Sequence, residues 1–108
     1  MIVNEKNVGP KIPYSVDATR ITFNEDLTIN LASREQDWPV HIDICHDSDR
    51  ALVIGAAAGR AYVAQIDIPA RQYNETVVDS DEFPDGEIVR TPIDLDMETV
   101  TLTLWAIE

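Results

Sequence analysis

Strict alternation of apolar and polar side chains over two long stretches most constrains the fold of this chain. In residues 98–107, ETVTLTLWAI, the side chains of Val100, Leu102 and Leu104 fall on one side of an extended backbone. Residues 61–68, AYVAQIDI, also alternate. A period of two places successive side chains on opposite faces of a strand. No window of twelve or more residues carries the 3.6-residue period of an amphipathic helix, so the sequence predicts strands.

The residue types support the same fold class. Valine and isoleucine together number 22 against six leucines, and eight threonines bring the β-branched total to 30 of 108 residues. Such side chains are stiff and pack well on a pleated surface. With seven to nine short strands between closely spaced turns, we expect an all-β fold. We predict one domain over residues 1–108, a single antiparallel β-sandwich that is jelly-roll-like, with a small closed barrel as the alternative.

Apolar patterning and turn residues place the individual strands. Proline should end one of them at residue 69, because it donates no ladder hydrogen bond. We expect the apolar segment 51–55 to be a central strand. The complete set of predicted elements is a hairpin over 20–32, strands over 40–46, 51–55, 61–68 and 98–107, and short strands over 75–78 and 87–90.

Charge limits the partners. Twenty acidic and eight basic residues give a net charge of −12, and residues 72–108 hold ten acids against the single base Arg90. Such a chain repels phosphate, so we expect neither nucleic-acid nor membrane binding. The chain has one cysteine and no apolar run beyond nine residues, and we expect no secretion signal, because its first residues do not place a basic segment before an apolar one. We therefore expect synthesis in the cytoplasm and no disulfide.

The stretch HIDICHDSD, residues 41–49, gathers both histidines and the one cysteine. If its isoleucines face the core, His41, Asp43 and Cys45 share the opposite face, and His46 points away from them. Zinc prefers three or four nitrogen or sulfur ligands in a tetrahedral array, which this spacing does not supply. The acids beside Cys45 disfavour a reactive thiolate. We expect a strand that enters a turn, with no catalytic, cofactor-binding or metal site.

Two further segments resemble known binding motifs but lack residues that those motifs require. The acidic loop 79–87, DSDEFPDGE, lacks the residue pattern of an EF-hand, although a less regular calcium site stays open. GAAAG, residues 55–59, lacks the spacing and lysine of a phosphate-binding loop. We interpret its glycines as breaks between two strands, with close approach to a partner backbone as the alternative.

The favoured function is a non-catalytic structural or interaction protein. Small all-β virion components, such as capsid decoration, head–tail joining or tail proteins, share this profile, and virion association follows from that hypothesis. The predicted partners are proteins, in a homo-oligomer or a larger assembly. Trp105 lies on a threonine-rich face and is either core or an exposed anchor at an interface. The predicted interface residues are Trp105, Ile107, Thr101, Thr103 and Trp38.

Two other function classes stay open. In a small ligand-binding module, Trp38, Tyr62, Tyr73 and Trp105 would stack on a carbohydrate, or the acids would hold calcium. An enzyme would need His41 or His46 to act as an acid or base with a carboxylate from a distant strand. We expect no enzyme, and no cofactor.

Overall fold

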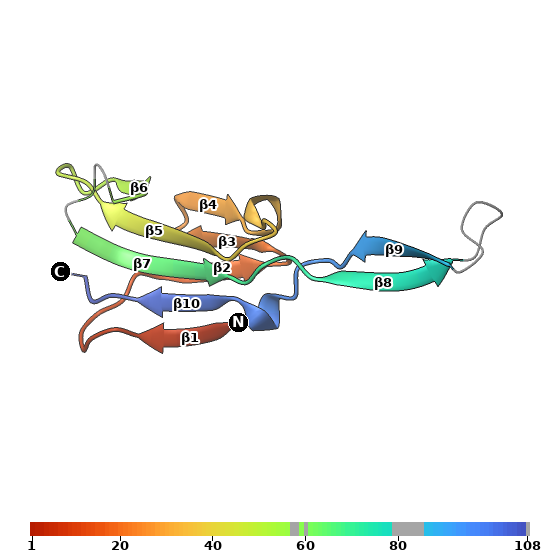
Figure 1. The fold of residues 1–108 in the computed structure, drawn as a ribbon. Helices are drawn as coiled ribbons and strands as arrows, with labels where there is room; N and C mark the ends of the chain where they lie inside the picture. Colours follow the sequence, from red (N-terminus) through yellow and green to blue (C-terminus); the bar gives the residue numbers. More distant parts are fainter. Residues whose placement is uncertain (57–58, 60, 79–85, 108) are drawn as a thin grey trace.

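Two packed sheets and a projecting hairpin make up the computed structural model, which describes residues 1–56, 59, 61–78 and 86–107 (Figure 1). The described residues form ten strands and two single turns of 3₁₀ helix, η1 (Ala32–Arg34) and η2 (Met97–Thr99). The predicted all-β class is confirmed. No helix in these ranges is long and apolar enough to cross a membrane.

The larger sheet has β7 at its centre, between β5 and β10. Both neighbours pair with β7 antiparallel, whereas the N-terminal β1 lies parallel to β10, so the two ends of the chain share one sheet edge. Within the described residues, the strands of this sheet in spatial order are β1 (Ile2–Glu5), β10 (Thr101–Leu104), β7 (Ala61–Ile68), β5 (Val40–His46) and β6 (Leu52–Ile54).

The smaller sheet is the meander β2 (Tyr14–Asp17), β3 (Arg20–Phe23) and β4 (Leu27–Asn30). Asn24 and Glu25 join β3 to β4 with φ angles of 53° and 56°. The amide of Asp26 donates to the carbonyl of Phe23 at 2.9 Å. Positive φ at both central residues is the I′ geometry that matches the twist of a hairpin. The hairpin predicted over residues 20–32 is confirmed.

A single apolar core lies between the two sheets, and we call these sheets with their connecting segments the body. Isoleucine, leucine and phenylalanine fill it from both sides, as the alternation predicted. The arrangement is sandwich-like, and the described strands close no barrel. The jelly-roll connectivity stays a prediction. The core consists of Ile12, Ile21, Phe23, Ile29, Leu31, Ile42, Ile44, Val63, Ala64, Ile66, Ile68, Val100, Leu102 and Leu104.

One irregularity shifts the alternation within β7. Ile44 of β5 pairs with Ala64, but the next residue, Cys45, pairs with Tyr62, so Val63 has no partner opposite. Such a β-bulge moves every residue beyond it to the other face. Tyr62 therefore lies on the outer face of the sheet, 40% exposed, instead of on the core side where simple alternation places it.

The hairpin of β8 (Tyr73–Val78) and β9 (Glu87–Pro92) projects from the body, and we call it the arm (Figure 1). It forms a separate two-stranded sheet. The molecule measures 64 × 24 × 22 Å and has a radius of gyration of 18.5 Å. A compact domain of this length has a radius of gyration of roughly 13 Å. The arm accounts for that difference because it extends the long axis.

The structure corrects the placement of one predicted strand. β6, within the segment expected to be central, lies at an edge of the larger sheet, and its Ile54 is 43% exposed. A short apolar run does not reveal how many neighbours it has. The strands β1 and β2 were not predicted, because all of their side chains are exposed and they carry no buried stripe. The prediction of one domain over residues 1–108 stays a prediction.

Candidate functional site

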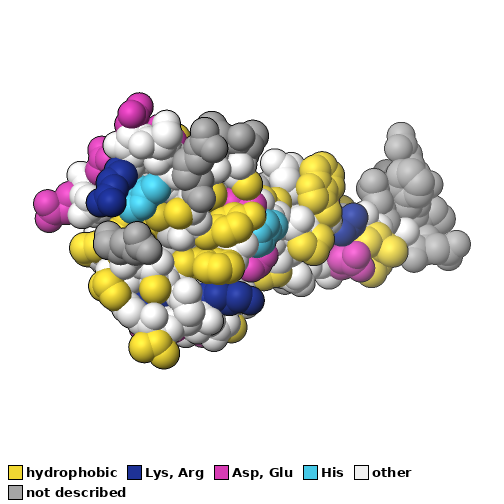
Figure 2. Space-filling model, turned by 90° about the vertical axis from the view of Figure 1, so that its left-hand side faces the viewer, with side chains coloured by type: hydrophobic (Ala, Val, Ile, Leu, Met, Phe, Trp, Pro, Cys, Tyr) yellow, Lys and Arg dark blue, Asp and Glu magenta, His cyan; other side chains and the backbone are white. Residues whose placement is uncertain are grey.

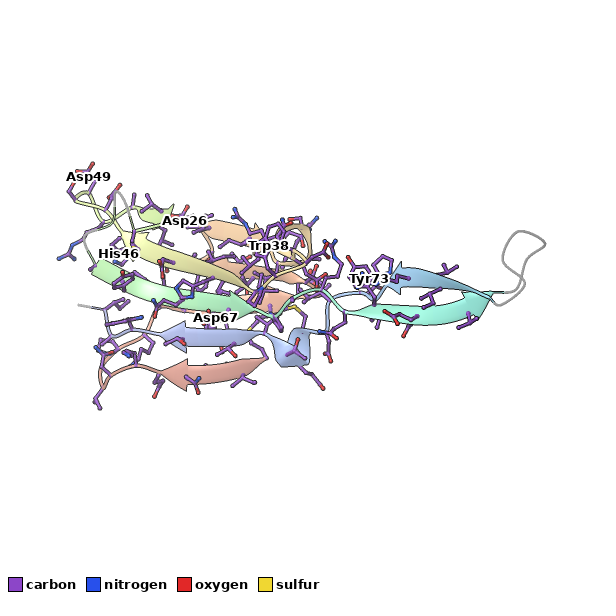
Figure 3. The ribbon with its side chains drawn as sticks, viewed as in Figure 1. Asp26, Trp38, His46, Asp49, Asp67 and Tyr73 are labelled. Atoms are coloured by element: carbon purple, nitrogen blue, oxygen red, sulfur yellow. The ribbon has the colours of Figure 1, made fainter. Side chains whose placement is uncertain are left out.

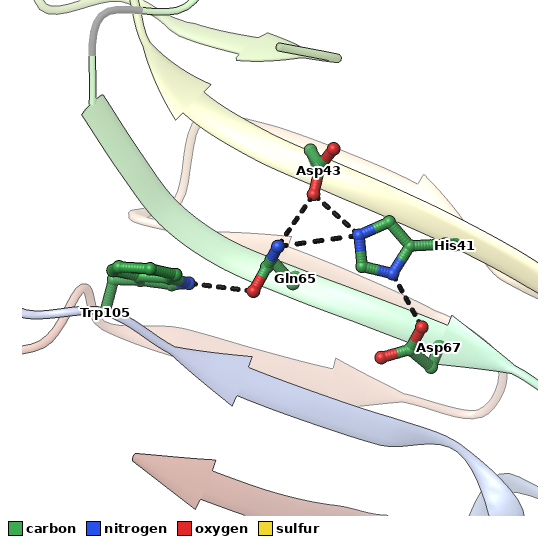
Figure 4. A network of polar contacts seen from close by, with 5 residues as sticks. All are labelled: His41, Asp43, Gln65, Asp67 and Trp105. Atoms are coloured by element: carbon green, nitrogen blue, oxygen red, sulfur yellow. Dashed lines mark hydrogen bonds and ion pairs between the residues drawn. The ribbon is translucent and has the colours of Figure 1, made fainter. Parts of the chain in front are cut away.

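His41 stands between two carboxylates on the outer face of the larger sheet, the face turned away from the core (Figure 4). Its Nδ1 lies 2.6 Å from Asp67 Oδ1, and its Nε2 lies 2.7 Å from Asp43 Oδ1. Asp43 follows two residues later on β5, and Asp67 is the residue paired with His41 on β7. The sequence correctly placed His41 and Asp43 on one face, but strand register was needed to bring in Asp67.

The two hydrogen bonds favour the charged form of the histidine. Each ring nitrogen faces a carboxylate oxygen, which accepts a hydrogen bond but cannot donate one when ionised. The hydrogen bond with Asp67 is the largest influence and raises the pKa of His41 above its ordinary value, with a smaller opposing effect from burial. The pKa of Asp43 is lowered, first by the hydrogen bond from Gln65. The geometry therefore favours the protonated imidazole, which can donate to both carboxylates.

This arrangement limits what His41 can do chemically. A general base needs a free ring nitrogen within reach of the proton that it removes. Here both nitrogens of His41 already bond to Asp43 and Asp67. Such geometry favours a cross-strand link between β5 and β7 over proton transfer. The expectation that the chain is no enzyme stays a prediction.

Gln65 extends the polar chain to Trp105 (Figure 4). Its Nε2 donates to Asp43 Oδ1 at 3.0 Å, and its Oε1 accepts from Trp105 Nε1 at 2.9 Å. The ring of Trp105 stacks on Tyr62 with centroids 5.1 Å apart, and Lys6 Nζ lies 5.6 Å from the Trp105 ring. Side chains from β5, β7 and the segment after β10 are therefore tied together across the outer face.

The four aromatic residues proposed as a carbohydrate platform fall into two groups. Tyr62 and Trp105 stack on each other on the outer face. Trp38 lies in the loop before β5, and Tyr73 is the first residue of the arm (Figure 3). The structure therefore does not bring all four together on one surface.

Cys45 and His46 do not join the cluster around His41. The thiol of Cys45 is buried, and burial together with the Asp43 charge raises its pKa, so the unreactive thiol is favoured. A Cβ at Gly59 would lie 2.5 Å from Cys45 Cβ, so the glycine is required by close approach to this side chain. His46, at the end of β5, lines a separate hollow of about 570 Å³ with Arg50.

The predicted interface residues lie in three places. Thr101, Thr103 and Trp105 are half-buried on the outer face of β10 and just beyond it. Ile107 packs against the core cluster, and its amide donates to the carbonyl of Pro10 at 2.7 Å. Trp38 is 61% exposed in the loop before β5. Their roles at an interface stay predictions.

No group of three or more histidine, cysteine, aspartate or glutamate side chains in the described ranges is arranged so that it could hold a metal ion. The possible calcium loop at residues 79–87 lies mostly outside them, because residues 79–85 are not described. The middle of GAAAG, residues 57 and 58, also lies outside the described part.

The arm exposes apolar side chains that sequence reasoning did not single out. Val77 and Ile88 are each 65% exposed, and they lie opposite each other in the hairpin. Figure 2 shows yellow side chains on the described part of the arm, with basic and acidic side chains beside them. The sequence signal was present in the paired segments TVV and EIV on either side of a turn-rich loop. Only the structure shows that the body does not cover them.

A network of charged and aromatic residues fixes the root of the arm. Arg71 Nε lies 3.4 Å from Glu35 Oε1, and Arg71 Nη1 lies 3.7 Å from Asp37 Oδ1. The hydroxyl of Tyr73 donates to Asp37, and the guanidinium of Arg90 lies 4.3 Å from the Tyr73 ring. The arm is therefore held at its base while its outer half has no neighbour among the described residues of the body.

Fold and site define an all-β protein with a sandwich-like body, a cross-strand polar cluster and a projecting arm. Comparison with protein-family models, curated proteins and solved structures gives no match.

Proposed function

We propose that this chain is a non-catalytic structural or interaction protein, a small subunit of a larger assembly that attaches to its partner through the arm. The observation that carries the proposal is the pair Val77 and Ile88, each 65% exposed on a hairpin that projects from the body. An isolated two-stranded hairpin is only marginally stable in water. A hairpin with uncovered apolar residues is therefore expected to gain stability when a partner covers it.

The virion form of this proposal is a capsid decoration, head–tail joining or tail component of a phage. Support comes from the small all-β body, the acidic charge and the elongated shape, which suits a subunit that reaches its neighbour. We expect the body to be of jelly-roll type. On the body, we propose further contacts with a partner at the three places that hold Trp105, Ile107, Thr101, Thr103 and Trp38.

The test compares the mass of the chain in native extract with that of an arm variant. We expect the wild-type chain to sediment in a particle much larger than its 12.1 kDa monomer. The double variant V77K/I88K should sediment as a smaller species, because charge on the apolar pair prevents docking. Thermal unfolding of the purified variant checks that the body is still folded.

The matched control is N74K/T91K, which places the same two charges on the opposite face of the same hairpin. It should sediment like the wild type. If the wild-type chain is monomeric in extract, or if both double variants behave alike, the arm is not the docking element.

A further inference from the structure

The β8 edge of the arm exposes unpaired backbone groups. The amide of Ile93 donates to the carbonyl of Gln72 at 2.9 Å, which makes these two residues a hydrogen-bonded pair. Antiparallel pairs alternate between hydrogen-bonded and non-hydrogen-bonded types. The pairs that contain Tyr73, Glu75 and Val77 are therefore of the second type, and the N–H and C=O groups of these residues point away from β9.

The body already forms a backbone hydrogen bond with the chain just before the start of this edge. The amide of Arg71, two residues before Tyr73, donates to the carbonyl of Gln36 at 2.7 Å. Beyond Arg71, no backbone hydrogen bond from Tyr73, Glu75 or Val77 to another segment is found within the described ranges. The edge therefore continues outwards from a paired position as an open template for a further strand.

The opposite edge of the arm is less suited to strand addition. Pro92 pairs with Tyr73, so its ring nitrogen occupies an outward position on β9 and donates no hydrogen bond. Only Ile88 and Arg90 offer outward N–H groups there. The β8 edge offers three consecutive outward positions, and the exposed Val77–Ile88 pair lies at its outer end.

We propose that the β8 edge binds an extended polypeptide segment in which apolar and basic side chains alternate, as an added third strand. This inference rests on the proposed function and names the partner that the arm docks to. Residues 73–92 hold six acids and one base in the sequence, and the whole chain carries −12, so its net charge attracts basic side chains on the added strand. A second copy of the chain is disfavoured, because each copy carries −12. Added strands of this kind gain affinity from main-chain hydrogen bonds and specificity from alternate side chains.

The test titrates the full chain with an acetylated, amidated heptapeptide of alternating lysine and valine, and a glutamate–valine heptapeptide serves as the control. Amide hydrogen exchange by NMR should slow at least tenfold at Tyr73, Glu75 and Val77 with the lysine peptide and stay unchanged with the glutamate peptide. No slowing at millimolar lysine peptide, or equal slowing with both peptides, would overturn the proposal.

Two proline variants separate the edges. V77P and I88P each remove one outward N–H and one exposed apolar side chain, on opposite edges but on the same face. We expect V77P to weaken peptide binding at least tenfold and I88P to weaken it less than threefold. Cross-strand NMR contacts between Thr76 and Val89 verify that the hairpin persists, and the exchange measurement on the wild type needs no variant. Equal losses would exclude edge binding, whereas the sedimentation of V77K/I88K tests the docking role of the arm separately.

Discussion

The body and the arm use the same aliphatic residue types but bury them to opposite extents. Ile66, in the central strand β7, is fully buried, whereas Ile88 in β9 is 65% exposed. The body has two sheets that cover each other, whereas the arm is one hairpin that no described strand covers. Residue type and strand propensity therefore do not determine what a strand contributes to stability. The presence of a second layer does.

The largest expected effect compares one substitution in the two regions. Ile66→Ala should lower the free energy of unfolding by about 2 to 5 kcal/mol, because it loses buried surface and leaves a cavity. Ile88→Ala should lower it by less than about 0.5 kcal/mol, as surface changes usually do. Urea denaturation followed by circular dichroism measures both. Similar losses in the two variants would mean that the arm is buried in solution, for example by self-association.

The sequence predicts buried strands better than exposed ones. Alternation predicted the buried strands well, because in Val40–His46 and Ala61–Ile68 one face must avoid water. It did not identify β1 and β2, whose side chains are exposed on both faces and so carry no periodic signal. The two short strands of the arm were predicted, but nothing in their residues indicates that they pair with each other and leave the body.

The candidate site was predicted in part, for a related reason. A period of two correctly placed His41 and Asp43 on one face. The partner Asp67 depends on strand order and register, which arise from long-range packing. The position of Tyr62 depends on the bulge at Val63, and a bulge leaves no composition signal in a run of small apolar residues.

A smaller effect is expected at the root of the arm. Tyr73→Phe removes the hydrogen bond to Asp37, which should cost about 1 kcal/mol of local stability. Amide exchange at Asn74, Thr76 and Thr91 should then speed up about fivefold, while the unfolding midpoint of the body stays unchanged. The measurement is hydrogen exchange by NMR.

Tyr62→Phe is the matched control, because it removes the same hydroxyl from a tyrosine of the body, which stacks on Trp105 on the outer face of the larger sheet. Exchange in the arm should be unaffected by it. If Tyr73→Phe instead lowers the unfolding midpoint of the body, the arm and the body unfold as one cooperative unit and do not differ in stability.

The smallest expected effect is a pH dependence confined to the body. The folded-state pKa of His41 is raised above its ordinary value of 6.5, chiefly by the hydrogen bond with Asp67. The resulting stabilisation is complete below pH 6.5 and is lost as the pH rises through the folded pKa. Because His41 is about half exposed, we expect only about 0.5 kcal/mol, as for other exposed ion pairs. Asp43, whose pKa is lowered, has the opposite pH dependence. Its contribution to stability is present at pH values above its ordinary pKa of 3.8 and is lost as the pH falls through the lowered folded-state pKa.

Thermal unfolding of the wild type, H41Q and H46Q between pH 5 and 8.5 tests this assignment. The difference in unfolding free energy between the wild type and H41Q should shrink with rising pH, and H46Q, which removes a histidine outside the cluster, is the matched control. Over this pH range, the difference in arm hydrogen exchange between the wild type and H41Q should stay constant, since the arm carries no part of the cluster. If H46Q alters the pH profile and H41Q does not, the hydrogen bonds of His41 to Asp43 and Asp67 do not stabilise the body.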